Sequence, residues 1–349
     1  MKKSLIALAV ASAVSAPAFA ATSNVDVYGQ LTVSYDYLNT DSKLANADKK
    51  LHRISSNASR IGFKGSEDLG GGLAAIWQIE NQLNMDGGSF TTGLRNTFVG
   101  LKSDAMGTVL LGNYDSPYKT ATGKLDIFAD TAGDFNNISG NVQGTTPFDQ
   151  RLKNGVQYLT PSFNGLSGAL AYAAQNETSN GALANPGTWA ISGMYENGPL
   201  FGSLAYEKHT NIGGVGGNDD ASGVKAGVGY KFGDLALGLI YERLSQTGST
   251  VNDRNAWYLN GAYNMGNIVL KAAYGQAGDG DTVAETGAKS YTLGADYVLS
   301  KRSKMYALYS KTKNDAGGTY GIGAGQGSAY TPAAGEDPSV FSLGMRHSF

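Results

Sequence analysis

The sequence closes with VFSLGMRHSF, residues 340–349, a stretch in which large apolar side chains alternate with small or polar ones. One parity carries Phe341, Leu343, Met345 and Phe349. A period of two is typical of a β-strand with one apolar face. A closed barrel pairs its final strand with its first and leaves no free edge. A strand ending on Phe349 fits such a barrel, with the ring at the membrane interface.

The same alternation recurs along the chain. In VDVYGQLTVSYDYL, residues 25–38, odd positions are mostly apolar and even positions mostly polar. In GLAAIWQIENQL, residues 72–83, Trp77 and Ile79 alternate with Gln78. Soluble sandwiches alternate in the same way, so this pattern predicts an all-β protein without deciding its architecture.

The links between the predicted strands favour a barrel. Sixteen candidate strands are joined by seven short turns, such as SFNG and NMGN, and by eight long polar links, such as HTNIGGVGGNDD. Short and long links alternate throughout, which places all turns at one end of an antiparallel sheet. We therefore predict a 16-stranded antiparallel transmembrane β-barrel with short periplasmic turns, long extracellular loops and a polar, water-filled interior. A secreted sandwich, the alternative, has no reason for this alternation.

The composition suits strands joined by tight turns, because the chain holds 49 Gly and 20 Tyr but only 8 Pro. Glycine is a poor helix former, and tyrosine favours strands. Tyrosines near predicted strand ends are expected to form aromatic girdles at the two membrane interfaces. This set comprises Tyr35, Tyr37, Tyr114, Tyr158, Tyr195, Tyr241, Tyr258 and Tyr309.

Residues 1–20, MKKSLIALAVASAVSAPAFA, have the features of a secretory signal peptide. Two lysines precede a short apolar run, and Ala18 and Ala20 form an A-x-A cleavage site. We expect cleavage after Ala20, which leaves residues 21–349 as the barrel domain.

Charge and residue usage argue against several other functions. The formal net charge is −2 without a basic run, which argues against nucleic acid as a partner. The chain has no Cys and only three His, and no G-x-S-x-G motif occurs, so neither disulfides nor catalysis are expected. No cofactor and no metal site are predicted.

Four segments resemble the general porins of Gram-negative bacteria, most closely the beta-proteobacterial type. They are SRIGFKGSEDLGGGLAAIWQIE (59–80), YLTPSFNGLSGALAY (158–172), VLSKRSKMYALYS (298–310) and GMRHSF (344–349). The resemblance implies a homotrimer surrounded by outer-membrane lipid, through which ions and small hydrophilic solutes diffuse passively. It also implies that the barrel-assembly machinery recognises the C-terminal aromatic residue, with Phe341, Leu343, Met345 and Phe349 as the signal.

The longest central link, residues 115–150, is the predicted constriction loop. A structureless segment of this length is unusual unless it is functional. The resemblance implies that it folds into the barrel and narrows it. Its charged residues include Lys119, Lys124, Asp126, Asp130 and Asp134.

The barrel wall opposite this loop is expected to supply cations. By their places in the motifs, Arg60, Arg95 and Arg151 match the arginine ladder of the porin family. Lys64 and Lys153 share the parity of Arg60 and Arg151 and extend the predicted ladder.

Parity supports two of the three arginines, because the apolar neighbours of Arg60 and Arg151 fall on the opposite parity. Val99 and Leu101, however, share the parity of Arg95, which conflicts with an inward position for that arginine. Rings of Arg and Lys favour anions, so we predict a mild anion preference.

Other interpretations remain open from the sequence. The arginines can simply pin the loop to the wall, or the loop carboxylates can control the passage and favour cations. A channel selective for phosphate, a sugar or an organic acid is the nearer functional alternative. A non-channel barrel, either an enzyme or an adhesin, is the more distant one.

Overall fold

The computed structural model describes residues 24–43, 50–87, 93–140, 148–174, 187–210, 220–247, 253–323 and 326–349. The predicted signal peptide, with Ala18 and Ala20, lies outside these residues. Within them, no helix is long and apolar enough to cross a membrane. The strands are β1 (Asn24–Asn39), β2 (Lys50–Ser56), β3 (Arg60–Gly70), β4 (Leu73–Gln82), β5 (Gly93–Leu94), β6 (Thr97–Ser103), β7 (Gly107–Asp115), β8 (Arg151–Leu159), β9 (Leu166–Ala174), β10 (Gly187–Asn197), β11 (Leu200–Thr210), β12 (Ala221–Phe232), β13 (Leu235–Gln246), β14 (Asp253–Met265), β15 (Ile268–Ala277), β16 (Ala288–Val298), β17 (Ser303–Asn314) and β18 (Ser339–Ser348).

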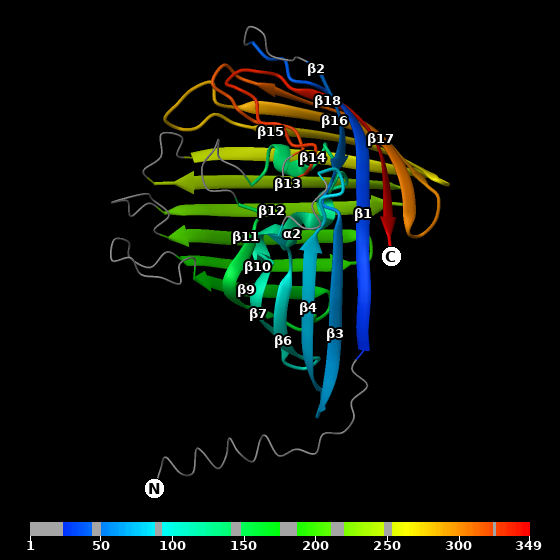
Figure 1. Cartoon of the computed structure of the whole chain (residues 1–349). Helices are drawn as coiled ribbons and strands as arrows, with labels where there is room; N and C mark the ends of the chain where they lie inside the picture. The colour runs from blue at the N-terminus through cyan, green and yellow to red at the C-terminus, as the bar shows by residue number, and fades with distance from the viewer. Residues whose placement is uncertain are drawn as a thin grey trace.

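All strands belong to one antiparallel sheet that closes on itself, because β1 pairs with β18 (Figure 1). β2 and β3 continue one another along β1, and β5 and β6 do so along β4. The eighteen hydrogen-bonded segments therefore make sixteen barrel strands, and the predicted fold is confirmed.

Phe349 and Gly29 complete the closure. The N–H group of each donates to the carbonyl oxygen of the other at 3.0 Å. The Phe349 ring lies over Gly29, where an added Cβ would be 2.4 Å from the ring atom Cζ. Only glycine leaves room for the ring at this position, and the ring in turn covers the exposed glycine backbone.

Short and long links alternate around the barrel. The turn between β3 and β4 has two residues, whereas 35 residues, 116–150, separate β7 from β8. Gly233 and Gly266, with φ of +60° and +61°, lie in the turns that follow β12 and β14. Such left-handed conformations are what tight hairpin turns require.

Outward and inward residues alternate along the strands. Phe341, Leu343 and Met345 are 43–48% exposed, whereas Ser342 between them is fully buried. The girdle prediction is wrong for two tyrosines, because Tyr114 and Tyr258 are buried on the inward face of their strands. The remaining six predicted girdle tyrosines are exposed or half-buried.

Candidate pore constriction

The long link after β7 lies inside the barrel over its described residues, 116–140 and 148–150 (Figure 1). It begins with α2 (Pro117–Thr122), for which Ser116 Oγ accepts the N–H of Lys119 at 3.1 Å. A serine N-cap followed by proline is a favourable helix start. Two 3₁₀ turns follow, Gly123–Leu125 and Phe135–Asn137.

Apolar side chains fix this loop to one side of the barrel interior. Tyr118 packs against Ala205 and Leu244, and Leu125 packs against Phe201. Further along the loop, other residues contact the inward faces of β14 to β18: Phe128, Phe135 and Ile138. The prediction of an interior that is polar throughout is therefore wrong, because the loop needs apolar wall residues to pack against.

A fully buried charge network also anchors the loop. Lys225 on β12 pairs with Asp149 of the loop and lies 3.6 Å from Glu242 on β13. Glu242 accepts hydrogen bonds from the hydroxyl of Tyr118 at 2.9 Å and from the N–H of Gly140 at 2.8 Å. Such a network is stable only when every charge keeps its partner. It therefore holds the loop against β12 and β13.

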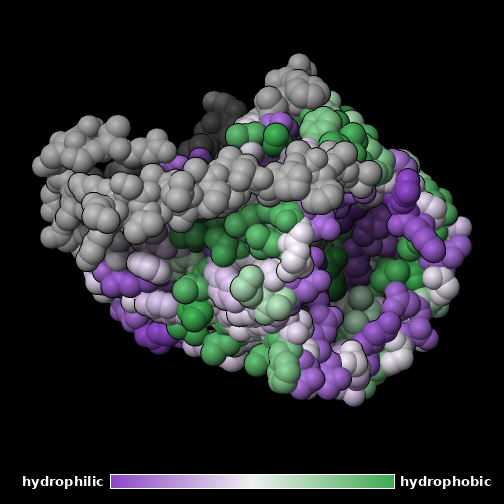
Figure 2. Space-filling view, turned by 90° about the horizontal axis from the view of Figure 1, so that it is seen from below, coloured by the Kyte–Doolittle hydropathy of each residue, from purple (hydrophilic) through white to green (hydrophobic). Residues whose placement is uncertain are grey.

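The opposite side of the interior stays open. A cavity of about 590 Å³ lies between the loop and the first strands of the barrel. Figure 2 shows hydrophilic residues bordering an opening into the molecule. The charged residues that line the cavity are Arg60, Arg95, Asp115, Lys119, Asp126, Asp130, Asp134, Asp149, Arg151 and Lys153.

Each of the three predicted arginines lies beside a place where one strand holds an extra residue. Between β2 and β3, residues 57–59 oppose only two residues of β1, and Ala58 has φ of +49°. Between β5 and β6, residues 95–97 oppose only two residues of β4. Within β8, residues 153–154 oppose only Asn113 of β7, and Asn154 has φ of +52°. Such β-bulges redirect neighbouring side chains and are common at functional sites.

The bulges explain the parity of the arginines. Arg95 is the first residue of its bulge, so it faces inward although Val99 and Leu101 are 56% and 48% exposed on the outer face. The bulge in β8 lies between Arg151 and Val156, so the parity argument for Arg151 does not hold. Arg151 nonetheless lines the cavity.

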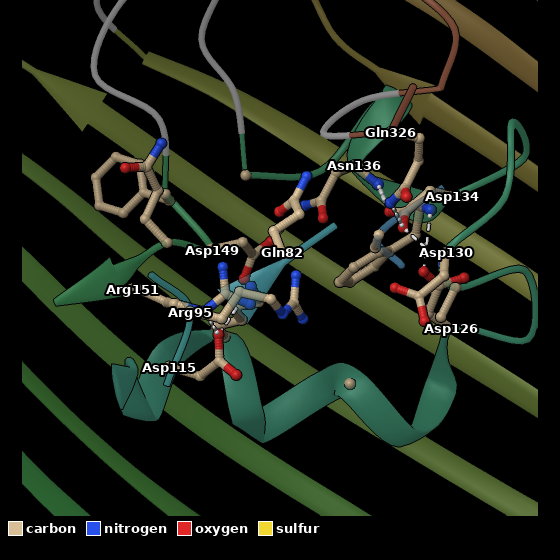
Figure 3. A pocket seen from close by; sticks show the side chains of 18 of the residues that line it. Gln82, Arg95, Asp115, Asp126, Asp130, Asp134, Asn136, Asp149, Arg151 and Gln326 are labelled. Atoms are coloured by element: carbon tan, nitrogen blue, oxygen red, sulfur yellow. Dashed lines mark hydrogen bonds and ion pairs between the residues drawn. The ribbon is translucent and has the colours of Figure 1, made fainter. Parts of the chain in front are cut away.

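Each arginine has a carboxylate partner. Arg60 Nη1 lies 3.3 Å from Asp130 Oδ2 of the loop, whereas Arg95 Nε lies 2.6 Å from Glu80 Oε1 on β4. Arg151 Nε lies 3.4 Å from Asp115 Oδ1 and also donates to Asn96 Oδ1 at 3.0 Å. Figure 3 shows Arg95 and Arg151 together near Asp115. Of these three arginines, Arg60 is the one pinned to the middle of the constriction loop.

Two of the three loop carboxylates mainly organise the loop. Asp126 accepts the N–H groups of Phe128 and Phe135, and Asp134 accepts that of Asn136 at 3.0 Å. Burial, reinforced by the charge of Asp134, raises the pKa of Asp126 well above its usual range. Burial also raises the pKa of Asp134 to about 6, against the opposing hydrogen bond from Asn136.

Asp130 differs from the other two acids. Burial alone would raise its pKa, but the guanidinium groups of Arg60 and Arg346 outweigh this effect and hold the pKa below its usual value. Asp126, Asp130 and Asp134 gather at the side of the cavity away from Arg95 and Arg151 (Figure 3). The passage therefore has a cationic side and a carboxylate side.

The structure brings together only some of the predicted lysines. Lys119 and Lys153 line the cavity, and Lys119 Nζ lies 2.9 Å from Asp115 Oδ1. Lys64 instead lines a separate hollow of about 340 Å³. Lys124 pairs with Glu196 at the end of β10, away from the arginines.

Sequence reasoning missed two contributions to the site. Arg346 on β18 donates to the carbonyl oxygen of Ala129 at 2.6 Å and so gives the loop a second arginine contact beside that of Arg60. The link after β17 also folds inward, because Gln326 lines the cavity and donates to Asp134 Oδ2 at 3.3 Å. Arg346 stands on the polar parity of 340–349, which could have indicated its inward position.

This architecture, a closed barrel whose interior is narrowed by an inserted loop with facing charges, defines a pore-forming membrane protein. The family described as "Gram-negative porin" matches residues 7–317. The chain belongs to this family.

Individual relatives agree with the assignment. "Outer membrane porin protein 32" of Delftia acidovorans is 31% identical over 366 aligned residues that cover all of both chains. "Major outer membrane protein P.IA" of Neisseria meningitidis serogroup B is 28% identical, again over all of both chains. The solved structure of an "Anion-selective porin from Comamonas acidovorans" has a TM-score of 0.80 at 26% identity and covers 94% of this chain and 100% of that chain.

The protein is therefore an outer-membrane porin, a channel for the passive diffusion of ions and small hydrophilic solutes and not an enzyme. Neither a substrate-selective channel nor a non-channel barrel is favoured. In the described part of the chain, no group of three or more His, Asp and Glu side chains is arranged to hold a metal ion.

Proposed function

We propose that this porin has a mild preference for anions, set by Arg60, Arg95 and Arg151. The observation that carries the proposal is the unequal state of the cavity charges. Five cationic side chains line the cavity, whereas burial favours the neutral form of Asp126, and Asp149 is neutralised by Lys225. The similarity to a relative described as an anion-selective porin adds support.

Arg95 and Arg151 lie on one side of the passage and Asp126, Asp130 and Asp134 on the other, while Arg60 pairs with Asp130. Fixed cationic side chains in a narrow, wet passage lower the energy of an anion that has lost part of its hydration shell. The carboxylates on the facing side reduce the net electrostatic field of the cationic side chains. A small field fits a mild preference for anions and does not fit an anion-binding site. Lys119 and Lys153 add positive charge to the same cavity.

The test is the reversal potential of the refolded protein in a planar bilayer under a KCl gradient. The reversal potential of the wild type should lie on the side of the chloride equilibrium potential. Joint replacement of Arg60, Arg95 and Arg151 by Ser should move the reversal potential towards the potassium equilibrium potential. A matched control replaces Lys64 and Lys124, two cations outside the cavity, and should leave the potential unchanged. An unmoved potential in the triple variant, or an equal shift in the control, would refute the assignment.

We also infer that the chain forms a homotrimer, as the resemblance to the porins implies. One solved relative, the OmpT protein of Vibrio cholerae, is described in a trimer form, which supports the inference. The mass of the detergent-solubilised protein tests it.

Two further inferences concern biogenesis. We infer that the outward residues Phe341, Leu343, Met345 and Phe349 are recognised by the barrel-assembly machinery, and that the signal peptide is removed after Ala20. Sequencing the N-terminus of the exported protein tests the cleavage.

A further inference from the structure

The outer surface of β16 and β17 carries three lysines near the end that bears the long links. Lys289, Lys311 and Lys313 share the outward parity of the exposed Tyr291 and Tyr309. In the strand register, Lys289 lies directly opposite Lys313, and Lys311 lies opposite Tyr291. Like charges directly opposite each other on one face destabilise a sheet. The arrangement therefore favours an anion between these side chains.

Two other cations at this end of the barrel are neutralised by the protein itself. Lys208 Nζ lies 2.9 Å from Asp220 Oδ2, and Arg243 Nη2 lies 2.9 Å from Asp253 Oδ2. Among the residues that the structure describes, Lys289, Lys311 and Lys313 form no such ion pair.

Two acids on the flanking links are engaged by backbone N–H groups. Asp279 accepts the N–H of Gly287 at 2.8 Å, and Asp337 accepts that of Asn314 at 2.9 Å. These two carboxylates hold the ends of the links. Because the three lysines form no ion pair among the described residues, their positive charge is left for an external partner.

The position of the lysines points to the kind of partner. Tyr309 lies opposite Phe341 in the register, and the ring centroids of Tyr291 and Tyr274 are 5.3 Å apart, so an aromatic girdle runs level with Lys311 and below Lys289 and Lys313. Such girdles lie at the level of lipid headgroups. Lys311 and Lys313 follow Tyr309 by two and four residues, roughly 7 and 13 Å along the strand. This spacing puts the two lysines at and just outside the level expected for the lipid headgroups.

We propose that Lys289, Lys311 and Lys313 bind the phosphate groups of an outer-leaflet lipid whose acyl chains lie against the apolar surface below. Leu293 and Met305, 63% and 53% exposed on the same face, supply that surface. Charge complementarity and the adjoining apolar band together favour a phosphorylated lipid over a soluble anion. The proposal rests on the barrel and its membrane, and it is independent of the arginines in the pore.

Binding of diphosphorylated lipid A to the folded, detergent-solubilised protein, counted by native mass spectrometry, tests the proposal. Replacing all three lysines by Gln should weaken binding by about a hundredfold, since each basic residue contributes about 1 kcal/mol at an anionic surface and about 1.4 kcal/mol corresponds to tenfold. Replacing Lys208 and Arg243 by Gln is the matched control and should change binding less than about twofold. Conductance of both variants should equal that of the wild type, which shows that the barrel is intact.

The wild-type protein gives a second readout that needs no substitution. Lipid A without its phosphates should bind at least about tenfold more weakly, and added salt should weaken only the phosphorylated form. Equal binding of both lipids, or equal binding by the lysine variant and the control, would overturn the proposal. Inorganic phosphate that binds as tightly as lipid A would also overturn it, because the apolar surface would then contribute nothing.

Discussion

Arg60 and Asp130 lie 3.3 Å apart and join the wall strand β3 to the constriction loop. The same carboxylate oxygen lies 3.6 Å from Arg346 Nη2 on β18, so two guanidinium groups share it. Asp130 thus has two effects. It holds the loop in place, and it lowers the positive potential that a passing anion meets at these two arginines.

Replacing Asp130 by Asn should raise the anion preference, because two cations lose their counter-charge while the side chain keeps its size. The reversal potential under a KCl gradient should move further towards that of chloride. Asp104 in a short turn, 98% exposed at its side chain, offers the control D104N. A shift in D130N no larger than that in D104N would contradict the prediction.

The selectivity should also depend on pH. The pKa of Asp134 is about 6 in the folded protein, against an ordinary value of 3.8. Between these two pH values the folded state binds the proton of Asp134 more tightly than the unfolded state does. The folded state is therefore stabilised by this group as the pH falls from about 6 to about 4, and the group adds no such stability above pH 6. Protonation also removes a negative charge from the cavity, so the anion preference should increase between pH 7 and pH 5.

Reversal potentials recorded across this pH range measure the effect. The variant D134N should lack the step near pH 6 and should resemble the acid form of the wild type at every pH. A wild-type step that persists unchanged in D134N would assign the titration to another group.

The buried network around Glu242 should dominate the anchoring of the loop. In E242Q, Lys225 and Arg254 lose their shared counter-charge while fully buried, and breaking such a pair costs about 3–5 kcal/mol. We expect a lower free energy of unfolding in denaturant titrations and greater open-channel current noise. The control D253N breaks the exposed pair with Arg243 and should cost about 0–1 kcal/mol. Equal losses in both variants would show that the network is not the anchor.

The contact between Gly29 and Phe349 can be tested by a double-mutant cycle. G29A should destabilise the barrel, because the new Cβ would lie 2.4 Å from the ring of Phe349. F349A should destabilise it as well, because the glycine backbone loses its cover. The double variant G29A/F349A should be more stable than the sum of the two losses predicts, since the clash with the ring disappears and only the 2.8 Å approach to the carbonyl oxygen of Arg60 remains. Additive losses in the denaturant titration would argue against the contact.

The number of strands was predictable because short turns and long links still alternate where a strand contains a bulge. Each short turn and each long link can be recognised in the sequence by its length and by its content of Gly, Asn and Asp. This holds even where the strands between them are irregular. Parity was informative for Arg60 because β3 runs without a bulge from Arg60 to the outward Phe63.

Parity failed where the backbone departs from a period of two. The bulges at 95–97 and 153–154 shift the register by one residue, and nothing in the sequence marks them as clearly as Gly and Pro mark a turn. The role of Asp126 was equally hidden, because spacing cannot tell a carboxylate that faces water from one that accepts backbone N–H groups. The inward fold of the link after β17 depends on contacts with Asp134 and Phe128, which are distant in sequence.

The pairing of β1 with β18 sets the order of events in biogenesis. The two strands that seal the barrel are the most widely separated in the chain, so one backbone edge of each stays unpaired until both ends of the chain meet. A partly folded chain consequently presents open sheet edges, which invite pairing with other chains. These edges are covered only when the sheet closes, so closure of the barrel is also the step that protects the chain from association with its neighbours.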